Sequence, residues 1–453
     1  MDTIVALATP SGRSAIGLVR LSGSNSLAIT RLLIADQTFQ PRPANVVRRN
    51  IRNLSNGQAI DQPLLTYYEA PNSFTGEDVV EISCHGSPLI LRAVIDSVLS
   101  VGARLAGPGE FTLRALNHGK MNLSQAEAIR DLINAQTDAA AQQAVRQLNG
   151  ELSNRLHPIK EALLNLIVLL ESAVEFVEDD LPLIQRKHIE EKVEHLIAQV
   201  DRLASTFESG HFLRDGLRVA IVGPPNAGKS TIFNRLLMFD RAIVTDIAGT
   251  TRDTLSETLN IGGVPVVLTD TAGLREDSAN LAESIGLERT KQAMADADLL
   301  LVVLDGSVPL TATEWEILRL SSDYRRVVAV NKLDLPQFRN ELADSNNDRG
   351  RVIEVSAKSE DGLGRLREAL VEPFHSFDTS DAGLLITDAR HYDLLCRTRT
   401  ELESACSLLN QGASEELVLN GLHNGLRFLG AITGETTAQD VLSQIFATFC
   451  IGK

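Results

Sequence analysis

One short segment constrains the fold of this 453-residue chain more than any other. Residues Gly223 to Ser230 read Gly-Pro-Pro-Asn-Ala-Gly-Lys-Ser and directly follow the apolar run Leu217 to Val222. The residues after Ser230 have a helical pattern. A glycine-rich loop between a strand and a helix turns its backbone N–H groups toward phosphate oxygens at the helix N-terminus. The segment therefore predicts a phosphate-binding P-loop within an α/β domain.

The side chains of this loop have distinct expected roles. Lys229 would neutralise the outer phosphates of a nucleotide, and the Ser230 hydroxyl would ligate Mg²⁺. A chance match in a glycine-containing loop is the alternative, and the strand and helix on either side of the loop argue against it. We expect the nucleotide to contact Asn226, Ala227, Gly228, Lys229, Ser230 and Thr231.

Two later motifs, each at the end of a predicted strand, indicate which base is bound. Asn331-Lys-Leu-Asp334 resembles the guanine-specificity motif of GTPases, and Ser356-Ala-Lys358 resembles the loop that supports the base. Asp334 would accept two hydrogen bonds from guanine, whereas adenine would leave the carboxylate unpaired, a discrimination on the order of 10⁴-fold. The expected contacts to GTP are Asn331, Lys332, Asp334, Ser356, Ala357 and Lys358.

Two segments between these motifs resemble GTPase switches. Asp270-Thr-Ala-Gly273 resembles the Walker-B and switch II element, with Asp270 close to Mg²⁺ and the Gly273 amide sensing the γ-phosphate. In the segment Thr245 to Asp253, which resembles switch I, Thr251 would close on Mg²⁺. Leu274 stands where a Ras-type enzyme has its water-positioning glutamine. The expected nucleotide contacts here are Thr245, Thr250, Thr251, Asp270, Thr271, Ala272 and Gly273.

A resemblance to potassium-activated GTPases indicates what replaces that glutamine. In those proteins a monovalent cation supplies charge where an arginine finger would act. The resemblance implies K⁺ binding by Asn226, Thr245, Ile247 and Thr250. Glu283 would orient the attacking water through a bridging water, with a solvated helix-start carboxylate as the alternative. The implied catalytic residues are Asn226, Lys229 and Glu283.

The chain reads as a multidomain protein. We predict an α+β N-terminal domain over 1–118, a mainly α-helical domain over 119–213 and 376–453, and an inserted Ras-like α/β P-loop domain over 214–375. Strand candidates in the inserted domain are Leu217 to Val222, Val266 to Leu268, Leu299 to Leu304 and Val327 to Val330. Ser124-Gln-Ala-Glu127 is a candidate capping box at the first helix.

Charge and composition narrow the location and partners. The formal net charge of -16 excludes a global positive field that would attract nucleic acid or an anionic membrane. The N-terminus lacks a signal peptide, no apolar run could span a bilayer, and the four scattered cysteines form no zinc or disulfide pattern, so we expect a cytoplasmic protein with no membrane partner. Arginines outnumber acids in the first fifty or so residues. We interpret that bias mainly as solvated surface, with RNA or anion binding as the alternative.

Both ends of the chain resemble the tRNA modification GTPase family, MnmE, also called TrmE. The resemblance covers the whole chain and includes Ser73-Phe-Thr-Gly-Glu-Asp78, Pro108-Gly-Glu-Phe111 and the terminal Cys450-Ile-Gly-Lys453. It implies a homodimer and an N-terminal site for a 5-formyl- or methylene-tetrahydrofolate carrier. The implied folate contacts are Arg20, Glu81, Lys120 and Lys453, although Glu81 could be an ordinary strand residue and Lys120 ordinary surface. Cys450 could act as a nucleophile or pack near the folate.

The family resemblance also implies a function. Its members act with an FAD-dependent partner, MnmG, to attach a (carboxymethyl)aminomethyl group at carbon 5 of the wobble uridine of certain tRNAs. The alternative is a ribosome-assembly GTPase of the Era or EngA type, which modifies no RNA covalently. The flanking motifs favour modification. A scaffold with a vestigial GTPase is disfavoured because Lys229, Ser230, Asp270 and Asp334 are intact.

Overall fold

The computed structural model divides into two compact units, each described here by itself. It describes residues 2–176, 183–240, 256–270, 294–342, 351–372, 383–436, 442 and 445–452. Unit 1 comprises Met1–Arg130, Gln147–Lys160 and Leu426–Lys453, and unit 2 comprises Asp131–Arg146 and Glu161–Gly425. Each unit therefore joins segments that are far apart in the chain. The finer division into segments 1–118, 119–213, 214–375 and 376–453 remains a prediction.

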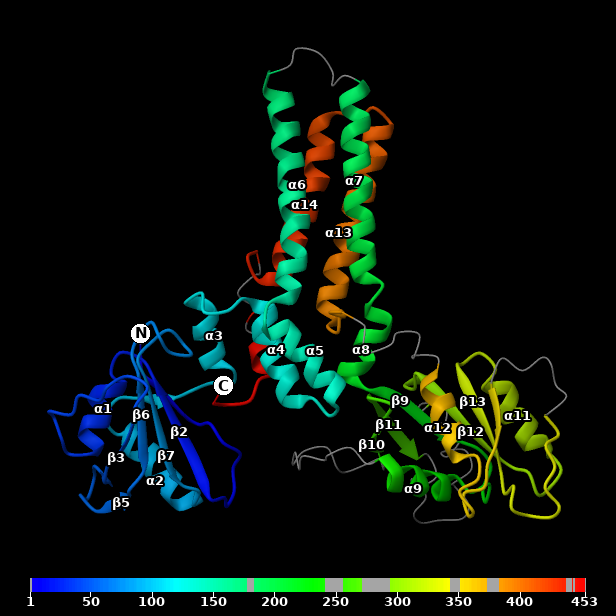
Figure 1. The fold of residues 1–453 in the computed structure, drawn as a ribbon, viewed down its shortest axis with the longest axis horizontal. Coiled ribbons are helices and arrows are strands. Elements are labelled where there is room, and N and C mark those ends of the chain that lie inside the picture. The colour runs from blue at the N-terminus through cyan, green and yellow to red at the C-terminus, as the bar shows by residue number, and fades with distance from the viewer. Residues whose placement is uncertain are drawn as a thin grey trace, which may run out of the picture. The chain divides into compact units, whose positions relative to one another are not determined.

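Unit 1 is built on a six-stranded sheet with the order β3-β6-β7-β2-β1-β8 (Figure 1). Its strands are β1 (Ile4–Leu7), β2 (Ile16–Ser22), β3 (Val46–Arg48), β6 (Leu64–Tyr68), β7 (Val79–His85) and β8 (Arg104–Leu105). A small separate sheet pairs β4 (Ile51–Arg52) with β5 (Ala59–Asp61). Residues of α1 (Ser26–Leu33) and α2 (Pro88–Leu99) share one apolar core with the large sheet. The N-terminal domain is thus α+β, as its alternating runs predict.

The C-terminal residues fold back onto this sheet domain within unit 1. Ile451 forms a β-bridge with Pro108, and the N–H of Gly109 donates to the Cys450 carbonyl at 3.4 Å. Phe446 and Phe449 are buried in one cluster with residues of α4 (Leu123–Asn134), which follows α3 (Glu110–Asn117). Close packing leaves no room for a side chain at Gly452, where a Cβ would lie 2.4 Å from the Leu7 carbonyl oxygen. The two ends of the chain therefore meet in one folded unit.

The helix α4 begins with a capping box, but two residues before the predicted one. The Asn122 side chain accepts from the Gln125 N–H at 3.0 Å, and the Gln125 side chain accepts from the Asn122 N–H at 3.0 Å. Ser124 instead donates to the Asn122 side chain, so the prediction of a box from Ser124 to Glu127 is wrong. Glu127 is buried inside the helix, which shows that its spacing from Ser124 reflects packing rather than capping.

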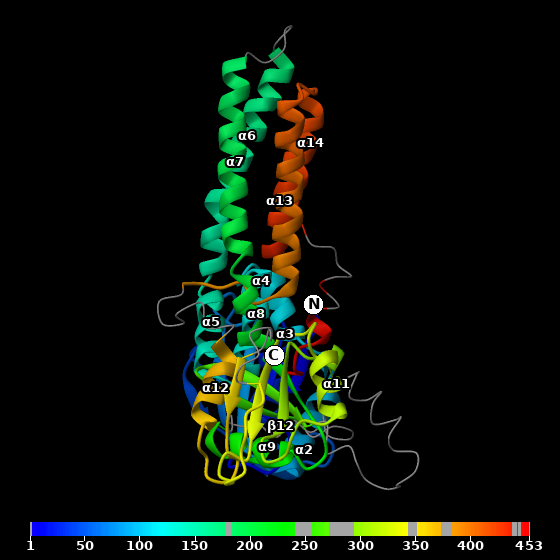
Figure 2. The ribbon, with the colours of Figure 1, turned by 90° about the vertical axis from the view of Figure 1, so that its right-hand side faces the viewer.

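Long helices in unit 2 bury one apolar stripe each. In Figures 1 and 2, the parts of α6 (Glu151–Phe176) and α14 (Glu415–Thr433) that belong to unit 2 run beside α7 (Leu183–Ala204) and α13 (Ala389–Asn410). The shorter helices α5 (Asp138–Leu148) and α8 (Phe207–Asp215) complete the predicted helical region before the P-loop domain. No helix in the described part of the chain is both long and apolar enough to cross a membrane.

The second six-stranded sheet, also in unit 2, has the order β10-β11-β9-β12-β13-β14. Its strands are β9 (Leu217–Val222), β10 (Ser256–Ile261), β11 (Val264–Asp270), β12 (Leu299–Asp305), β13 (Arg326–Asn331) and β14 (Arg351–Glu354). All pairs are parallel except β10 with β11. The helices α9 (Lys229–Asp240), α11 (Ala312–Leu320) and α12 (Leu363–Val371) belong to the same fold. The four predicted strand runs all lie within these strands, which confirms the α/β fold class.

Candidate functional site

The candidate nucleotide site lies at the carboxyl ends of β9 and β13. The strand β9 has β11 on one side and β12 on the other, so the direction of the chain connections reverses beside it. In parallel α/β sheets, ligands bind at such a point, outside the carboxyl ends of the strands. The P-loop follows β9, the Asn331 motif follows β13, and Asp270 ends β11. One edge of the sheet therefore collects three of the predicted motifs.

The P-loop has the backbone geometry that a phosphate cradle requires. Asn226 has a φ of 65°, and Gly228 has a φ of 93°. A Cβ at Gly223 would lie 2.2 Å from the Val303 carbonyl oxygen. The Lys229 ammonium, at the first residue of α9, donates to the carbonyls of Gly223 at 2.9 Å and Pro224 at 2.7 Å. The loop is thus closed tightly around its lysine, and its residues fit a bound phosphate chain.

Asn331 connects the P-loop to the base-supporting loop. Its Nδ2 donates to the Ala227 carbonyl at 2.8 Å, and its Oδ1 accepts from the Ala357 N–H at 3.0 Å. The side chain is buried, as are Ala227 and Ala357. Asn331 was expected to contact the nucleotide, and in the structure its amide holds two backbone segments together. A single side chain thereby sets the spacing between the phosphate and base regions.

The residues predicted to select guanine are held by polar contacts. The Ser356 hydroxyl donates to Asp334 Oδ1 at 2.7 Å and accepts from the backbone N–H groups of Lys358 and Ser359. The Lys332 ammonium forms an ion pair with Asp305. Burial raises the pKa of Asp305, but the hydrogen bonds from Lys332 and Ser307 outweigh it and lower that pKa. Asp334 is exposed and oriented by Ser356, which is the arrangement needed to receive a base.

Two residues of this site escaped the sequence analysis. Arg235 of α9 donates from Nε to the Ala357 carbonyl at 3.1 Å and from Nη1 to Glu360 at 2.7 Å. Asp305, at the end of β12, carries the ion pair to Lys332. The position of Asp305 at a strand end was an available signal. Arg235 offered no such signal, because its partners Ala357 and Glu360 are more than a hundred residues away in sequence.

The sequence also predicts site residues that the structure does not describe. For Asp270 the structure describes the backbone, as the last residue of β11, and not the side chain. The other such residues are Thr245, Ile247, Thr250, Thr251, Thr271, Ala272, Gly273, Glu283 and Lys453.

The predicted folate residues of the N-terminal domain form a second constellation. Arg20 and Glu81 are direct partners on β2 and β7, and Arg20 donates to Glu81 Oε1 from Nε at 2.9 Å and Nη2 at 2.7 Å. Arg20 Nη1 also reaches the Gly452 carbonyl at 3.4 Å. The Lys120 ammonium donates to the Pro71 carbonyl at 2.8 Å. Two of the residues implied as folate contacts, Arg20 and Glu81, therefore bind each other.

The Ser73–Asp78 motif has a structural role that the sequence did not reveal. Ser22 shares a hydrogen bond of 2.7 Å with Thr75 and donates to Glu77 at 2.7 Å. Arg114 of α3 is buried and donates to both oxygens of Glu77, at 3.1 and 3.0 Å. The motif also brings the Phe74 ring to 5.8 Å from the Arg20 guanidinium carbon. This loop thus orders the surroundings of Arg20.

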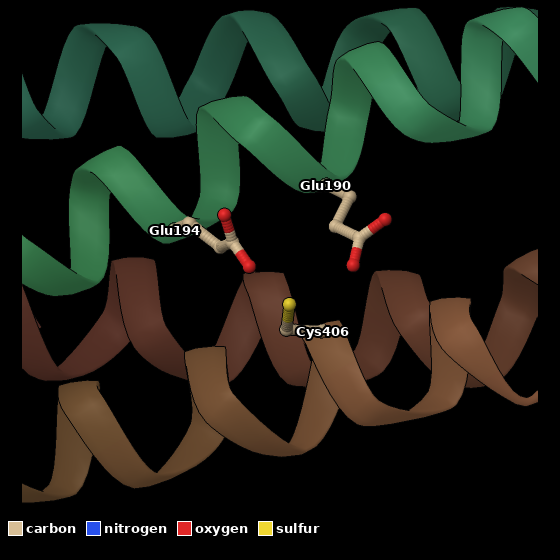
Figure 3. Close-up of side chains that lie close together, drawn as sticks. All are labelled: Glu190, Glu194 and Cys406. Carbon is tan, nitrogen blue, oxygen red and sulfur yellow. The ribbon is translucent and has the colours of Figure 1, made fainter.

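A third group of polar side chains lies between two long helices. Glu190 and Glu194 of α7 face Cys406 of α13, and their ligand atoms lie within 4.8 Å of one another (Figure 3). Burial raises the pKa of the Cys406 thiol, and both carboxylates raise it further. Exposed acidic groups are common without a bound metal ion, so we assign no metal to these three residues.

Comparisons with known proteins agree with both units. A family model described as the MnmE helical domain matches residues 123–450, and one described as the GTP-binding protein TrmE N-terminus matches residues 3–120. Proteins named tRNA modification GTPase MnmE from Koribacter versatilis and Aquifex aeolicus are each 41% identical to this chain. Both alignments cover 100% of this chain. They cover 99% of the Koribacter versatilis protein and 100% of the Aquifex aeolicus protein. A protein of the same name from Nitrosospira multiformis is 40% identical, with 100% of this chain and 99% of its own length covered.

Proposed function

This chain belongs to the MnmE family of tRNA modification GTPases, and from that membership we propose that it hydrolyses GTP to drive modification of the tRNA wobble uridine. The observation that carries the GTP assignment is the Asn331 bridge. It holds the P-loop and the Ser356 loop at a fixed spacing, and Ser356 in turn orients Asp334. A phosphate cradle linked in this way to an oriented carboxylate fits a guanine nucleotide.

We propose specific roles for the site residues. Lys229 and the P-loop amides would hold the phosphates, and Ser230, with Thr251, would ligate Mg²⁺. Asn226 would bind K⁺ together with Thr245, Ile247 and Thr250, and Glu283 would orient the attacking water. The positive φ of Asn226 supports its assignment, because that conformation turns the loop backbone sharply at this residue. Turnover lost in Glu283→Ala with GTP affinity retained would support its role.

The chemistry on the tRNA would be shared with an FAD-dependent partner, MnmG. Together they would add a (carboxymethyl)aminomethyl group at uridine C5, with a one-carbon unit from a tetrahydrofolate. We further propose that the protein is a homodimer in the cytoplasm. The membership of the chain in the MnmE family supports this assignment.

We propose that the folate carrier binds near Arg20, Glu81, Lys120 and Lys453. The side chains of Arg20 and Glu81 are 18% and 21% exposed, so both can be reached from solvent. A ligand carboxylate would compete with Glu81 for Arg20. Calorimetry with 5-formyltetrahydrofolate tests this: Arg20→Ala should weaken binding at least tenfold, whereas the exposed Arg42→Ala should not. Unchanged affinity in Arg20→Ala would remove Arg20 from the site.

The function as a whole is tested in cells that lack this protein. Mass spectrometry of tRNA nucleosides should detect loss of the modified wobble uridine. Wild-type protein should restore the nucleoside, and Lys229→Ala should not, because the phosphate-binding lysine is gone. An unchanged nucleoside profile in the deletion strain would contradict the proposal and favour a ribosome-assembly GTPase of the Era or EngA type.

A further inference from the structure

Four arginines lie close together in sequence, in and beside β3, the edge strand of the N-terminal sheet. We call Arg42, Arg48, Arg49 and Arg52 the edge arginines, and all four are exposed. The strand β3, which ends at Arg48, is the last strand of the six-stranded sheet and pairs on one side with β6 (Figure 1). Arg52 belongs to the small sheet of β4 and β5. Four of the arginines in the first fifty or so residues are therefore exposed in and just beside the edge strand β3.

No acidic residue lies near the edge arginines in sequence. Residues 37–60 contain four arginines and neither aspartate nor glutamate. The flanking acids are bound locally: Asp36 accepts from the N–H and hydroxyl of Thr38 at 3.0 and 2.7 Å, and Asp61 accepts from the His85 N–H at 2.8 Å. The segment therefore carries a local positive charge in a chain whose net charge is -16.

Three arginines elsewhere in this domain show the contrast, because each is paired with a carboxylate. Arg20 binds Glu81, Arg104 binds Glu110, and Arg114 binds Glu77 and Glu110. Within the described residues, none of the edge arginines forms a salt bridge. The edge arginines thus differ from these three in having no salt-bridge partner in the described part of the chain, although the pKa of Asp36, which the hydrogen bonds from Thr38 lower, is lowered further by the charge of Arg49.

One edge arginine is already ordered. The Arg49 guanidinium carbon lies 5.2 Å from the centroid of the Phe39 ring, and its Nη1 donates to the Arg48 carbonyl at 3.0 Å. An ordered guanidinium loses less side-chain entropy on binding than a free one. The exposed amides of Asn45 and Asn50 add hydrogen-bond donors to the same segment. Arginines with amides beside them suit the oxygens of a phosphate backbone.

We propose that the edge arginines bind the phosphate backbone of RNA. The assignment rests on the proposed function, because tRNA is the RNA on which this family acts. Local positive charge on an acidic protein attracts a polyanion only where it is concentrated, and this segment is such a place. The competing explanation is that charged residues on an edge strand prevent sheets of two molecules from pairing.

Binding of labelled tRNA to the full chain, measured by fluorescence anisotropy over a series of KCl concentrations, tests the proposal. The variant Arg48→Gln/Arg49→Gln/Arg52→Gln should bind at least tenfold more weakly at about 0.1 M KCl, with a salt slope reduced by about 2–3. The matched control is Arg92→Gln/Arg155→Gln/Arg397→Gln. It removes the same charge from exposed arginines that pair with carboxylates, and it should bind like wild type.

Further measurements make the outcomes decisive. GTP hydrolysis and thermal unfolding should be unchanged in both variants, and Arg48→Lys/Arg49→Lys/Arg52→Lys should recover most of the binding. Equal tRNA binding by the triple glutamine variant and wild type would overturn the proposal, as would self-association of that variant without loss of RNA binding. If wild type restores the modified nucleoside in cells while the triple glutamine variant binds tRNA normally, the proposed function stands and the assignment of RNA binding to the edge arginines is wrong. If wild type also fails in cells, the proposed function is wrong.

Discussion

The bridge made by Asn331 predicts that one substitution will weaken two distant parts of the nucleotide site. Asn331→Ala removes the donor to the Ala227 carbonyl and the acceptor for the Ala357 N–H. Both backbone groups belong to buried residues, so water cannot easily replace the lost partner. The P-loop and the base-supporting loop should then move independently of each other.

The magnitude follows from the two bonds. A buried polar group left without its partner costs about 1–3 kcal/mol, so with two such groups the P-loop domain should lose roughly 2–6 kcal/mol of unfolding free energy. Every 1.4 kcal/mol corresponds to a tenfold change in affinity. Because both loops contact the nucleotide in the proposed mode, part of this loss should appear in binding, and we expect GDP affinity to fall by at least about tenfold.

Fluorescent GDP binding and urea unfolding measure these two effects. The control is Asn340→Ala. Asn340 also donates and accepts one bond each, to Glu354 at 3.0 Å and from the Leu342 N–H at 3.1 Å, but it joins no nucleotide loop. It should change stability without changing GDP affinity. If Asn331→Ala binds GDP within twofold of wild type, Asn331 does not set the spacing of the site.

Three further predictions concern other parts of the structure. Asp334→Asn should lose affinity for GTP and gain affinity for xanthosine triphosphate, because the new amide can donate to the xanthine 2-carbonyl. Competition binding measures both affinities, and a retained preference for GTP would remove Asp334 from base recognition. Gly223→Ala should abolish nucleotide binding, since its Cβ would lie 2.2 Å from the Val303 carbonyl oxygen; calorimetry with GDP checks this. In unit 1, burial raises the pKa of Glu110, but hydrogen bonds from Arg104, the Gly107 N–H and Arg114 outweigh burial and hold that pKa below its ordinary value. A depressed pKa contributes stability that is present above the ordinary pKa and lost as pH falls through the folded value. Urea unfolding should therefore show stability falling from about pH 5 to pH 3, and Arg114→Gln should cost about 3–5 kcal/mol at neutral pH and flatten that slope.

Local sequence patterns predicted the P-loop domain well. Its strands are continuous apolar runs because a parallel sheet is covered on both faces, and each motif follows such a run directly. The strand β10 escaped prediction. It is the antiparallel edge strand, and its sequence, Ser-Glu-Thr-Leu-Asn-Ile, has polar residues where the central strands are apolar. The capping box was misplaced because Ser124 and Asn122 are both good caps, and only the packing of α4 distinguishes them.

Contacts between remote residues could not be read from the chain. Nothing near Arg20 in sequence indicates that Glu81 would neutralise it, or that Gly452, 432 residues away, would accept its hydrogen bond. The same holds for Arg114 and the Ser73–Asp78 motif. Such pairs depend on strand register and on where the chain returns, which are properties of the whole fold.

The sequence by itself determined the local patterns of this protein: a loop predicted to bind phosphate, a carboxylate predicted to select guanine, and the family to which the chain is similar. These signals are local because glycine conformation and strand-end position act over a few residues. Only the tertiary structure decided how the parts are connected. It made Asn331 a bridge between loops, paired Arg20 with Glu81, and left the edge arginines without a salt bridge among the described residues, because burial and long-range hydrogen bonds are settled when distant segments pack together.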